Sequence, residues 1–486
     1  MKKVISLVLT VVILLTMAVP SLASYDADAP EEVAQYDGCP VIIVRGIDFA
    51  GLTYEDGTKA LQFSVADIIP LLVKATLTRF GLSAKDLLIE SAMDIAYDVL
   101  SPLACDKEGN TVEPISMVQY PGSMANYPEF VDKLPDGGEE GIVKTAVEKY
   151  GAENTYFFTY DWRKTPQQIA GELKGFVETA KADSGKDKVN IICASMGCMV
   201  TTAYMYYHGT DSINSAVYLS GAHNGTYVCG DALNGRIVFE SEVLIEMLSN
   251  STNNLLLKVL LTVFDSIGAF DSLIDLANGI VTDSFDMAND KVLRDCFGTL
   301  CGFWALCPDD DFESGLQTIF GGHESEYPVL LEKIAETKEF VFSTEETLVN
   351  AKNSGVKISF VSNYNKALIP LYERANSNGD GVLESELTSN FATYAPLGEK
   401  LSPEYIESRD PMYISADKVV DASTALFPDN TWFVKDAPHV AADYKTEFSD
   451  FTFALLESEV QPDVTMFEEY PQFMFADTML NLYPLS

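Results

Sequence analysis

Residues 189–200 read VNIICASMGCMV, and this stretch decides the fold of the chain. A β-branched run leads into a single serine, Ser195, and a helix-like segment (201–207) follows it. Two small residues flank the serine: Cys193 lies two positions before it and Gly197 two positions after it. This pattern is typical of a nucleophile elbow, a sharp turn between a strand and a helix that exposes a reactive serine. The usual G-x-S-x-G motif appears here as C-x-S-x-G.

The N-terminus has the pattern of a secretory signal peptide. Lys2 and Lys3 precede an apolar run (4–19), and small residues around Ala23 follow that run. We therefore expect cleavage after residue 23 and a secreted, extracellular protein. No later segment reaches the roughly 18 uninterrupted apolar residues that a membrane span requires, so we expect no stable span.

The composition limits the classes of partner. The 486 residues are 47% hydrophobic and carry a formal net charge of −40. That length suits one elaborated domain or two ordinary ones. Because capture of a polyanion needs a basic surface, the charge excludes nucleic acid as a partner.

Eight cysteines in an exported chain favour disulfides. Cys193 and Cys198 flank the elbow serine, and we expect them to be packing residues. Cys296, Cys301 and Cys307 cluster along the sequence and could tie down one surface excursion. No histidine or paired C-x-x-C accompanies them, so we predict no metal site and no cofactor.

Apolar, β-branched runs predict buried parallel strands at 40–44, 155–160, 189–193, 215–219, 356–361 and 431–434. Helical patterns between them favour an α/β fold with a mostly parallel central sheet flanked by helices. Excess length lies at 47–150, which includes an amphipathic stretch (65–100), and again between the fourth and fifth strands. There, one helical apolar stripe is formed by Leu256, Leu260, Val263, Ile267, Phe270 and Ile274. The stripe either packs on the core or faces a hydrophobic substrate from a helical cap.

The domain prediction follows from these patterns. Residues 1–23 are the signal peptide, 24–229 and 351–445 form the core, and 230–350 form a helical cap or lid. Beyond 445 we expect the strands to stop and an acidic tail (446–486) to lie at the periphery.

A serine hydroxyl needs a histidine to accept its proton and a carboxylate to orient the imidazole. The chain has four histidines: His208, His223, His323 and His439. Only His439 lies in a loop after the last predicted strand, which agrees with the chain order serine, acid, histidine. We therefore select His439 as the catalytic base.

The acid should lie between the fifth predicted strand and His439. Asp380, in the tight turn NGDGV (378–382), is favoured over Asp417, and Asp421 is a more distant third. The turn also resembles a calcium loop, but Leu387 occupies the position where such a loop carries a bidentate glutamate.

An oxyanion hole needs backbone N–H groups aimed at the developing charge. One donor is expected from Met196, directly after the serine. The other is expected from Ile47, because Gly46 allows the loop after the first strand to come close.

Five segments occur in an order that resembles a known family: PVIIVRGI (40–47), YDWR (160–163), ASMG (194–197), GAHNGT (221–226) and GDGV (379–382). Together they are similar to the α/β-hydrolase superfamily and, within it, to lipases and acyltransferases of the lecithin:cholesterol acyltransferase type. The resemblance implies an α/β-hydrolase sheet with a lid, acyl-ester hydrolysis or transfer, and a triad of Ser195, Asp380 and His439. Arg45, Cys193 and Ala194 depart from the family pattern. We interpret Asp161 and Arg163 as a structural pair near the sheet edge, with orientation of the substrate as the alternative.

We therefore expect a secreted serine esterase or lipase that acts on a small-molecule or lipid ester, with transient contact to a lipid interface through the cap. A lipid O-acyltransferase is the alternative within this class. A non-catalytic binding protein on a hydrolase scaffold is the alternative outside it, and a peptidase of the same fold is less favoured.

Overall fold

The structure is a computed structural model. It describes residues 38–49, 51–61, 65–81, 94–95, 97–112, 114–135, 140–236, 255–266, 268–269, 289–368, 372, 374–444 and 446–486. The predicted signal peptide lies outside the described residues. Within the described part of the chain, no helix combines the length and the apolarity needed to cross a membrane.

An eight-stranded sheet forms the centre of the molecule, in the order β12-β11-β10-β7-β6-β5-β1-β4. Neighbouring strands in this sheet run parallel, except that β11 and β12 run antiparallel to each other. The strands are β1 (Val41–Val44), β4 (Thr155–Phe158), β5 (Val189–Ala194), β6 (Ile213–Leu219), β7 (Lys357–Tyr364), β10 (Thr431–Lys435), β11 (Phe473–Ala476) and β12 (Leu482–Pro484). All six strands expected from the sequence are therefore confirmed.

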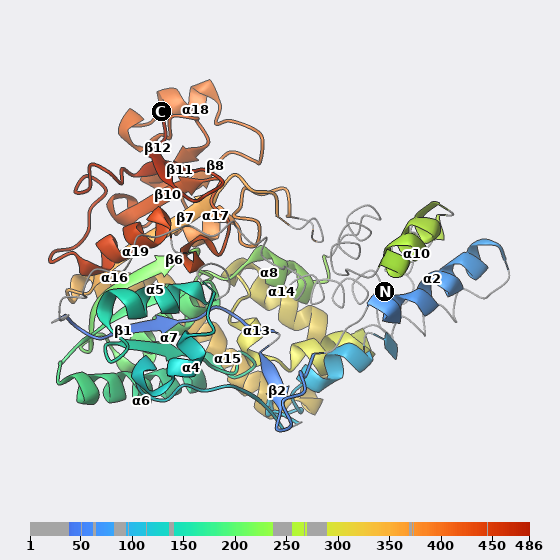
Figure 1. Cartoon of the computed structure of the whole chain (residues 1–486). Helices are drawn as coiled ribbons and strands as arrows, with labels where there is room; N and C mark the ends of the chain where they lie inside the picture. The colour runs from blue at the N-terminus through green and yellow to red at the C-terminus, as the bar shows by residue number, and fades with distance from the viewer. Residues whose placement is uncertain are drawn as a thin grey trace.

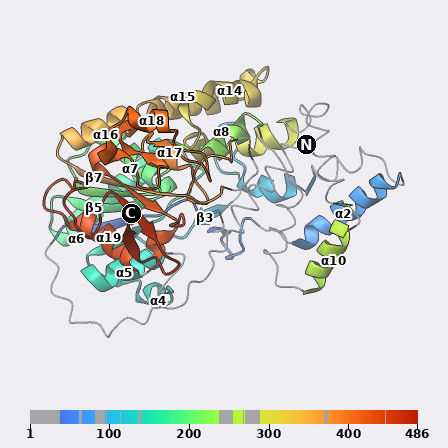
Figure 2. The ribbon, with the colours of Figure 1, turned by 90° about the horizontal axis from the view of Figure 1, so that it is seen from above.

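Both faces of the sheet are buried, which is why its strands read as continuous apolar runs. In β1, Ile42 and Val44 belong to one apolar cluster, whereas Val41 and Ile43 belong to another on the opposite face. Helices α6 (Pro166–Ser184), α7 (Met196–His208) and α16 (Thr344–Asn353) cover the first face, and α5 (Gly141–Tyr150) and α19 (Glu447–Glu457) cover the second (Figure 2). This three-layer arrangement confirms the predicted fold class.

The remaining elements lie around this core. The longer ones are α2 (Val65–Arg79), α8 (Tyr227–Leu233), α10 (Leu255–Ser266), α14 (Asp309–Phe320), α15 (Pro328–Phe342) and the π-helix η3 (Asn289–Gly298). Short helices are α4 (Pro128–Val131), α13 (Cys301–Trp304), α17 (Ser385–Thr388) and α18 (Pro403–Glu407), and single 3-10 turns are η1 (Ser101–Leu103), η2 (Met124–Asn126), η4 (Glu324–Glu326), η5 (Pro411–Tyr413), η6 (Ala422–Thr424), η7 (Pro428–Asn430) and η8 (Ala441–Asp443). Two small antiparallel pairs lie outside this sheet: β2 (Leu52–Tyr54) pairs with β3 (Ile115–Met117), and β8 (Thr393–Tyr394) pairs with β9 (Val420–Asp421).

The C-terminal segment is not a peripheral tail, so that prediction was wrong. The sheet continues beyond residue 446 with β11 and β12, and α19 packs on the second face of the sheet. Phe451 and Leu455 of α19 are fully buried, as is Met474 of β11. The acidic side chains along this segment hid its apolar face, because charge counts say nothing about which side of an element they occupy.

The second insertion ends earlier than residue 350. Helices α15 and α16 cover the core helices α6 and α7, and the ring of Phe340 lies 5.7 Å from that of Tyr206 on α7. They belong to the core, where a helix must bridge β6 and β7.

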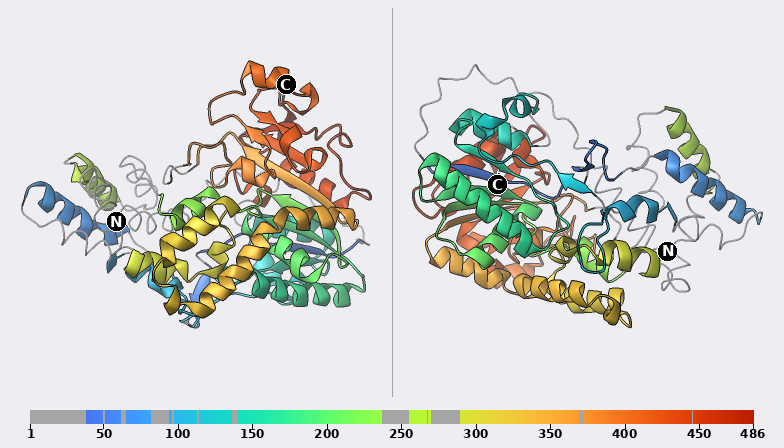
Figure 3. Two further views of the ribbon diagram at one scale, coloured as in Figure 1. Left: turned by 180° about the vertical axis from the view of Figure 1, so that it is seen from behind. Right: turned by 90° about the horizontal axis from the view of Figure 1, so that it is seen from below.

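Helices α2 and α10, one from each insertion, lie side by side away from the sheet (Figures 1 and 3). The apolar stripe expected in this region is not the buried face of α10. Leu261 is buried, while Val263 is 49% exposed. Ile267, Phe270 and Ile274 lie outside the described residues, and the side chains of Leu256 and Leu260 are not described.

Candidate active site

Ser195 lies in the sharp turn between β5 and α7. Its backbone has φ 52° and ψ −127°, a conformation that L-residues rarely adopt and that marks a strained turn. Its N–H donates to the Leu219 carbonyl (3.1 Å), and its carbonyl accepts from the Ala222 N–H (2.9 Å). These bonds to the end of β6 hold the strained residue in place.

Two glycines, one in the turn and one in the loop after β1, allow the turn to form. A Cβ at Gly197 would lie 2.3 Å from the Val44 carbonyl oxygen, so only glycine lets α7 begin against β1. A Cβ at Gly46 would lie 3.0 Å from the Ser195 Cβ. The loop that follows β1, which carries Ile47, therefore runs directly against the serine. Met196, the other expected oxyanion donor, is the first residue of α7.

Asp380 and His439 meet in the structure. Oδ2 of Asp380 lies 2.7 Å from Nδ1 of His439, and the His439 N–H donates to the Asp380 carbonyl (3.1 Å). Oδ1 of Asp380 accepts from the backbone N–H groups of Val382 (2.9 Å) and Leu383 (2.8 Å). Both carboxylate oxygens are thus hydrogen-bonded, which fixes the orientation of the carboxylate toward the imidazole.

The electrostatic surroundings favour a basic imidazole. Burial alone would lower the pKa of His439, but the charge of Asp380 and its hydrogen bond outweigh burial, and the net effect raises the pKa above its usual 6.5. With Nδ1 bound to the carboxylate, Nε2 is left to exchange a proton with another group.

The other histidines lie in different surroundings. His223 is buried between the rings of Tyr218 and Phe360, and burial lowers its pKa to about 4. His323 is exposed and pairs with Glu326. His208 ends α7, where burial lowers its pKa.

The alternative acids are engaged elsewhere. Asp417 forms an ion pair with Lys435 (2.9 Å) and accepts hydrogen bonds from Tyr364 and Ser415. Asp421 is fully buried and accepts from Tyr405 (2.9 Å) and from Ser423. These contacts direct both carboxylates away from His439, whereas Asp380 is hydrogen-bonded to it.

The turn around Asp380 is not arranged as a calcium loop. Oδ1 of Asn378 accepts from the Asn365 N–H (2.7 Å), and its Nδ2 donates to the Ala395 carbonyl (3.2 Å). Because these side-chain atoms bind backbone, they are unavailable as ligands. Among the described residues, no group of histidine, cysteine, aspartate or glutamate side chains could hold a metal ion.

The structural pair expected near the sheet edge is present. Asp161 binds the guanidinium of Arg163 through Nε (2.9 Å) and Nη2 (2.6 Å), and both residues are buried. Cys193 and Cys198 are fully buried next to the elbow, as expected of packing residues. Cys296, Cys301 and Cys307 are buried free thiols and do not tie down a surface excursion.

Sequence reasoning missed the residues that hold the acid and histidine loops. Glu384 is fully buried and accepts from Tyr372 (2.6 Å), from Thr226 (3.0 Å) and from the N–H of Tyr227 (3.1 Å). It ties the Asp380 loop to the start of α8. Asn363, at the end of β7, donates to the Pro438 carbonyl (2.9 Å) and so holds the loop of His439. The sequence carries no signal for either, since their partners lie far along the chain.

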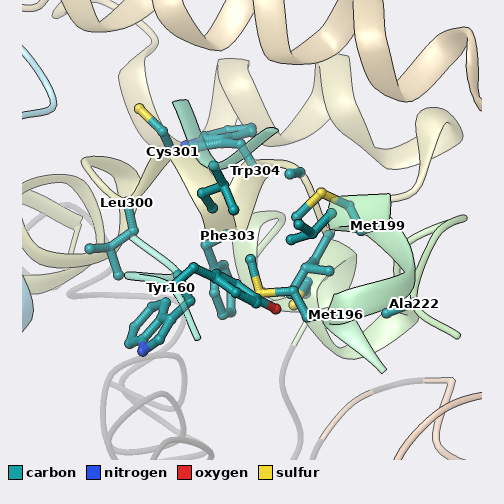
Figure 4. Packing of buried hydrophobic residues seen from close by; sticks show 14 of the residues in the cluster. Tyr160, Met196, Met199, Ala222, Leu300, Cys301, Phe303 and Trp304 are labelled. Carbon is teal, nitrogen blue, oxygen red and sulfur yellow. The ribbon is translucent and has the colours of Figure 1, made fainter. Parts of the chain in front are cut away.

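The insertion packs directly on the elbow helix. In the apolar cluster of Figure 4, Met196 and Met199 of α7 lie beside Phe303 and Trp304 of α13. A narrow cavity of about 10 Å³ lies between Phe49, Trp162 and the residues Leu100, Leu103, Cys296, Phe297, Leu300 and Phe303. The buried side chains of α13 and those of the elbow helix therefore belong to one apolar cluster.

A mostly parallel sheet with a serine elbow, an acid loop and a histidine loop after three of its strands is the arrangement of the α/β-hydrolase fold, and this chain has that fold. Residues 142–246 match the model of the lecithin:cholesterol acyltransferase family. That match supports a lipid-acting hydrolase or acyltransferase.

Two solved structures are similar at 11% identity. One is the Tle4–Tli4 complex, with a TM-score of 0.29 and coverage of 68% of this chain and 75% of the other. The other is an esterase, RhEst1, from Rhodococcus sp. ECU1013, with a TM-score of 0.24 and coverage of 87% and 90%. No protein of curated function matches the sequence.

Proposed function

We propose that the protein is a serine esterase or lipase that cleaves carboxylic esters of lipids through an acyl-enzyme intermediate. The contact between Asp380 and His439 carries this proposal, because it orients an imidazole as a triad requires. Ser195, Asp380 and His439 follow the carboxyl ends of β5, β7 and β10, which run parallel in one sheet. Their loops therefore gather at the same edge.

The chemical steps follow from these roles. Nε2 of His439 takes the hydroxyl proton of Ser195 as Oγ attacks the ester carbonyl, and Asp380 stabilises the imidazolium. The backbone N–H groups of Met196 and Ile47 donate hydrogen bonds to the oxyanion as its negative charge develops. The imidazolium then gives its proton to the leaving alcohol. A water molecule, activated by the same imidazole, releases the acid.

The apolar helices favour lipid esters over small polar ones. On and just after α2, the exposed side chains Val73, Leu77 and Phe80 repeat at helical spacing, and on α10 Val263 is exposed. We propose that these helices form a cap that touches a lipid interface transiently. Secretion, with cleavage after residue 23, is the last part of the proposal.

Transfer of the acyl group to an alcohol is the second candidate, favoured by the family match at residues 142–246. The test is labelling by a fluorophosphonate together with hydrolysis of p-nitrophenyl esters. We expect stoichiometric labelling that Ser195→Ala abolishes, and loss of hydrolysis in the same variant. No labelling of the folded wild type would favour a non-catalytic binding protein. Product analysis with and without an added alcohol separates the hydrolase from the acyltransferase.

A further inference from the structure

Arg45 stands directly after β1, between the strand and the loop that runs against Ser195. Its side chain is only 14% exposed, and Nη1 contacts Asp48 Oδ2 at 2.9 Å and Glu140 Oε1 at 2.7 Å. The guanidinium also lies 5.9 Å from the ring centre of Phe157. The guanidinium of Arg45 thus links Asp48, in the loop after β1, to Glu140, the residue before α5.

The backbone of Arg45 is held as well. Its carbonyl accepts from the hydroxyl of Tyr160 (3.0 Å) and lies where a Cβ on Gly197 would collide with it. At the other end of the loop, Asp48 Oδ1 accepts from the Gly51 N–H (2.7 Å). The ion pair between Arg45 and Asp48 therefore spans Gly46 and Ile47 and fixes both ends of this short stretch.

We infer that Arg45 is a positioning residue that braces the Gly46–Ile47 stretch against Ser195, so that the backbone N–H of Ile47 is held ready for the oxyanion. The inference rests on the proposed hydrolysis. Most of the energetic value of an oxyanion hole comes from donors fixed before charge develops. A loop that moves by a fraction of an ångström loses that value, even when the substrate still binds.

The ion pairs can act in this way because they are shielded. The side chains of Asp48 and Glu140 are 11% and 18% exposed, so water screens them less than an open surface pair. Arginine suits the position because it presents several N–H donors in a rigid plane, whereas lysine offers a point charge.

The test compares Arg45→Met and Arg45→Lys with Lys164→Met, which breaks the half-exposed pair of Lys164 with Glu172. With a p-nitrophenyl ester, we expect kcat of Arg45→Met to fall about 10- to 100-fold, because the displaced loop stabilises the transition state less well. KM should stay within about threefold, because the loop is not expected to contribute to binding of the ester before it reacts. Arg45→Lys should recover part of this loss. The control should keep kcat within about twofold, as expected for an exposed pair.

Hydrogen–deuterium exchange of a peptide covering Gly46–Phe49 gives a readout that needs no activity. We expect faster exchange there in Arg45→Met and wild-type exchange in Lys164→Met. If exchange in Arg45→Met were unchanged, or if kcat were unchanged despite faster exchange, Arg45 would not be a positioning residue. If the wild type did not hydrolyse esters, the proposed function would fail, while the exchange experiment would still decide whether Arg45 holds the loop.

Discussion

Asp380 and His439 are 59 positions apart in the sequence and 2.7 Å apart in the structure. A second contact, from the His439 N–H to the Asp380 carbonyl, joins the same two residues through their backbones. The two loops therefore hold each other in register, and the side-chain hydrogen bond does not depend on long flexible chains. This paired contact is what selects Asp380 over the other carboxylates.

The raised pKa of His439 predicts the pH dependence of hydrolysis. The imidazole must be neutral to accept a proton, so kcat/KM should rise with pH through an apparent pKa above 6.5. In Asp380→Asn the raising charge is gone while burial remains, so that apparent pKa should move down. The same variant should lose about 10⁴-fold in kcat, as expected when the imidazole loses its orienting carboxylate. A pH–rate profile of both proteins checks the direction, and an unmoved pKa would contradict the assignment.

Asp417→Asn separates the two candidate acids. Its carboxylate binds Lys435 and Tyr364, so the variant should lose stability by about 1–3 kcal/mol through a broken, partly buried ion pair. Its kcat should stay within about threefold of the wild type, because the partners of Asp417 are Lys435 and Tyr364, whereas His439 pairs with Asp380. Urea unfolding and ester hydrolysis measure the two effects. A loss of kcat as large as that of Asp380→Asn would reverse the assignment.

Gly197→Ala tests the geometry of the elbow. The added methyl would lie 2.3 Å from the Val44 carbonyl oxygen, so α7 must shift away from β1. We expect destabilisation of about 1–3 kcal/mol, as for overpacking in a core, together with loss of ester hydrolysis. Gly171→Ala on α6 is the matched control, since its methyl would meet nothing within 4 Å. That variant should gain about 0.5–1 kcal/mol from helix propensity. Thermal unfolding of the pair is the measurement.

His223 predicts sensitivity to acid. Its folded pKa of about 4 lies below the usual 6.5, so between these values the unfolded chain binds a proton that the folded chain does not. The contribution of His223 to stability is thus present above pH 6.5 and is lost as the pH falls toward 4. The slope is about 1.4 kcal/mol per pH unit. His223→Gln can keep a donor near Asn390 without titrating, and its loss of stability over this range should be smaller. The free energy of unfolding in urea, measured at several pH values, checks this. If it changed with pH by the same slope in the wild type and in His223→Gln, the role of His223 would be contradicted.

The exposed side chains around α2 predict binding to lipid. Phe80, just after α2, is 64% exposed, and Leu77 lies one helical turn before it. Phe80→Ser should weaken binding to phosphatidylcholine vesicles about 10- to 100-fold, since burial of one phenylalanine is worth about 1.5–3 kcal/mol. Uncharged vesicles are the suitable probe because the chain carries a net charge of −40. Val460→Ser, another exposed apolar position, should leave sedimentation with vesicles unchanged. Equal losses in both variants would argue against a contact through the cap.

Local pattern predicted the strands of the core well and the edge of the sheet poorly. The runs at β1, β5 and β6 are apolar on both faces, which leaves few alternatives to a buried parallel strand. β11 and β12 are short, half-exposed and set among acidic residues. They become strands because β10 offers an edge to pair with, a fact that lies outside their own sequence.

For the candidate site the division is similar. The elbow at Ser195 could be read from a few consecutive residues, because strand, turn and helix all lie within them. The order of serine, acid and histidine along the chain then left His439 as the favoured base but did not separate Asp380 from Asp417 by any physical measure.

The sequence by itself determined the layered fold, the serine turn and the glycines that permit it, because burial and backbone conformation follow local pattern. The tertiary structure alone decided which carboxylate meets His439, that Glu384 and Asn363 hold the two loops, and that Arg45 reaches Glu140. These contacts join residues that are distant in the chain. They exist because the sheet brings the ends of its parallel strands to one edge.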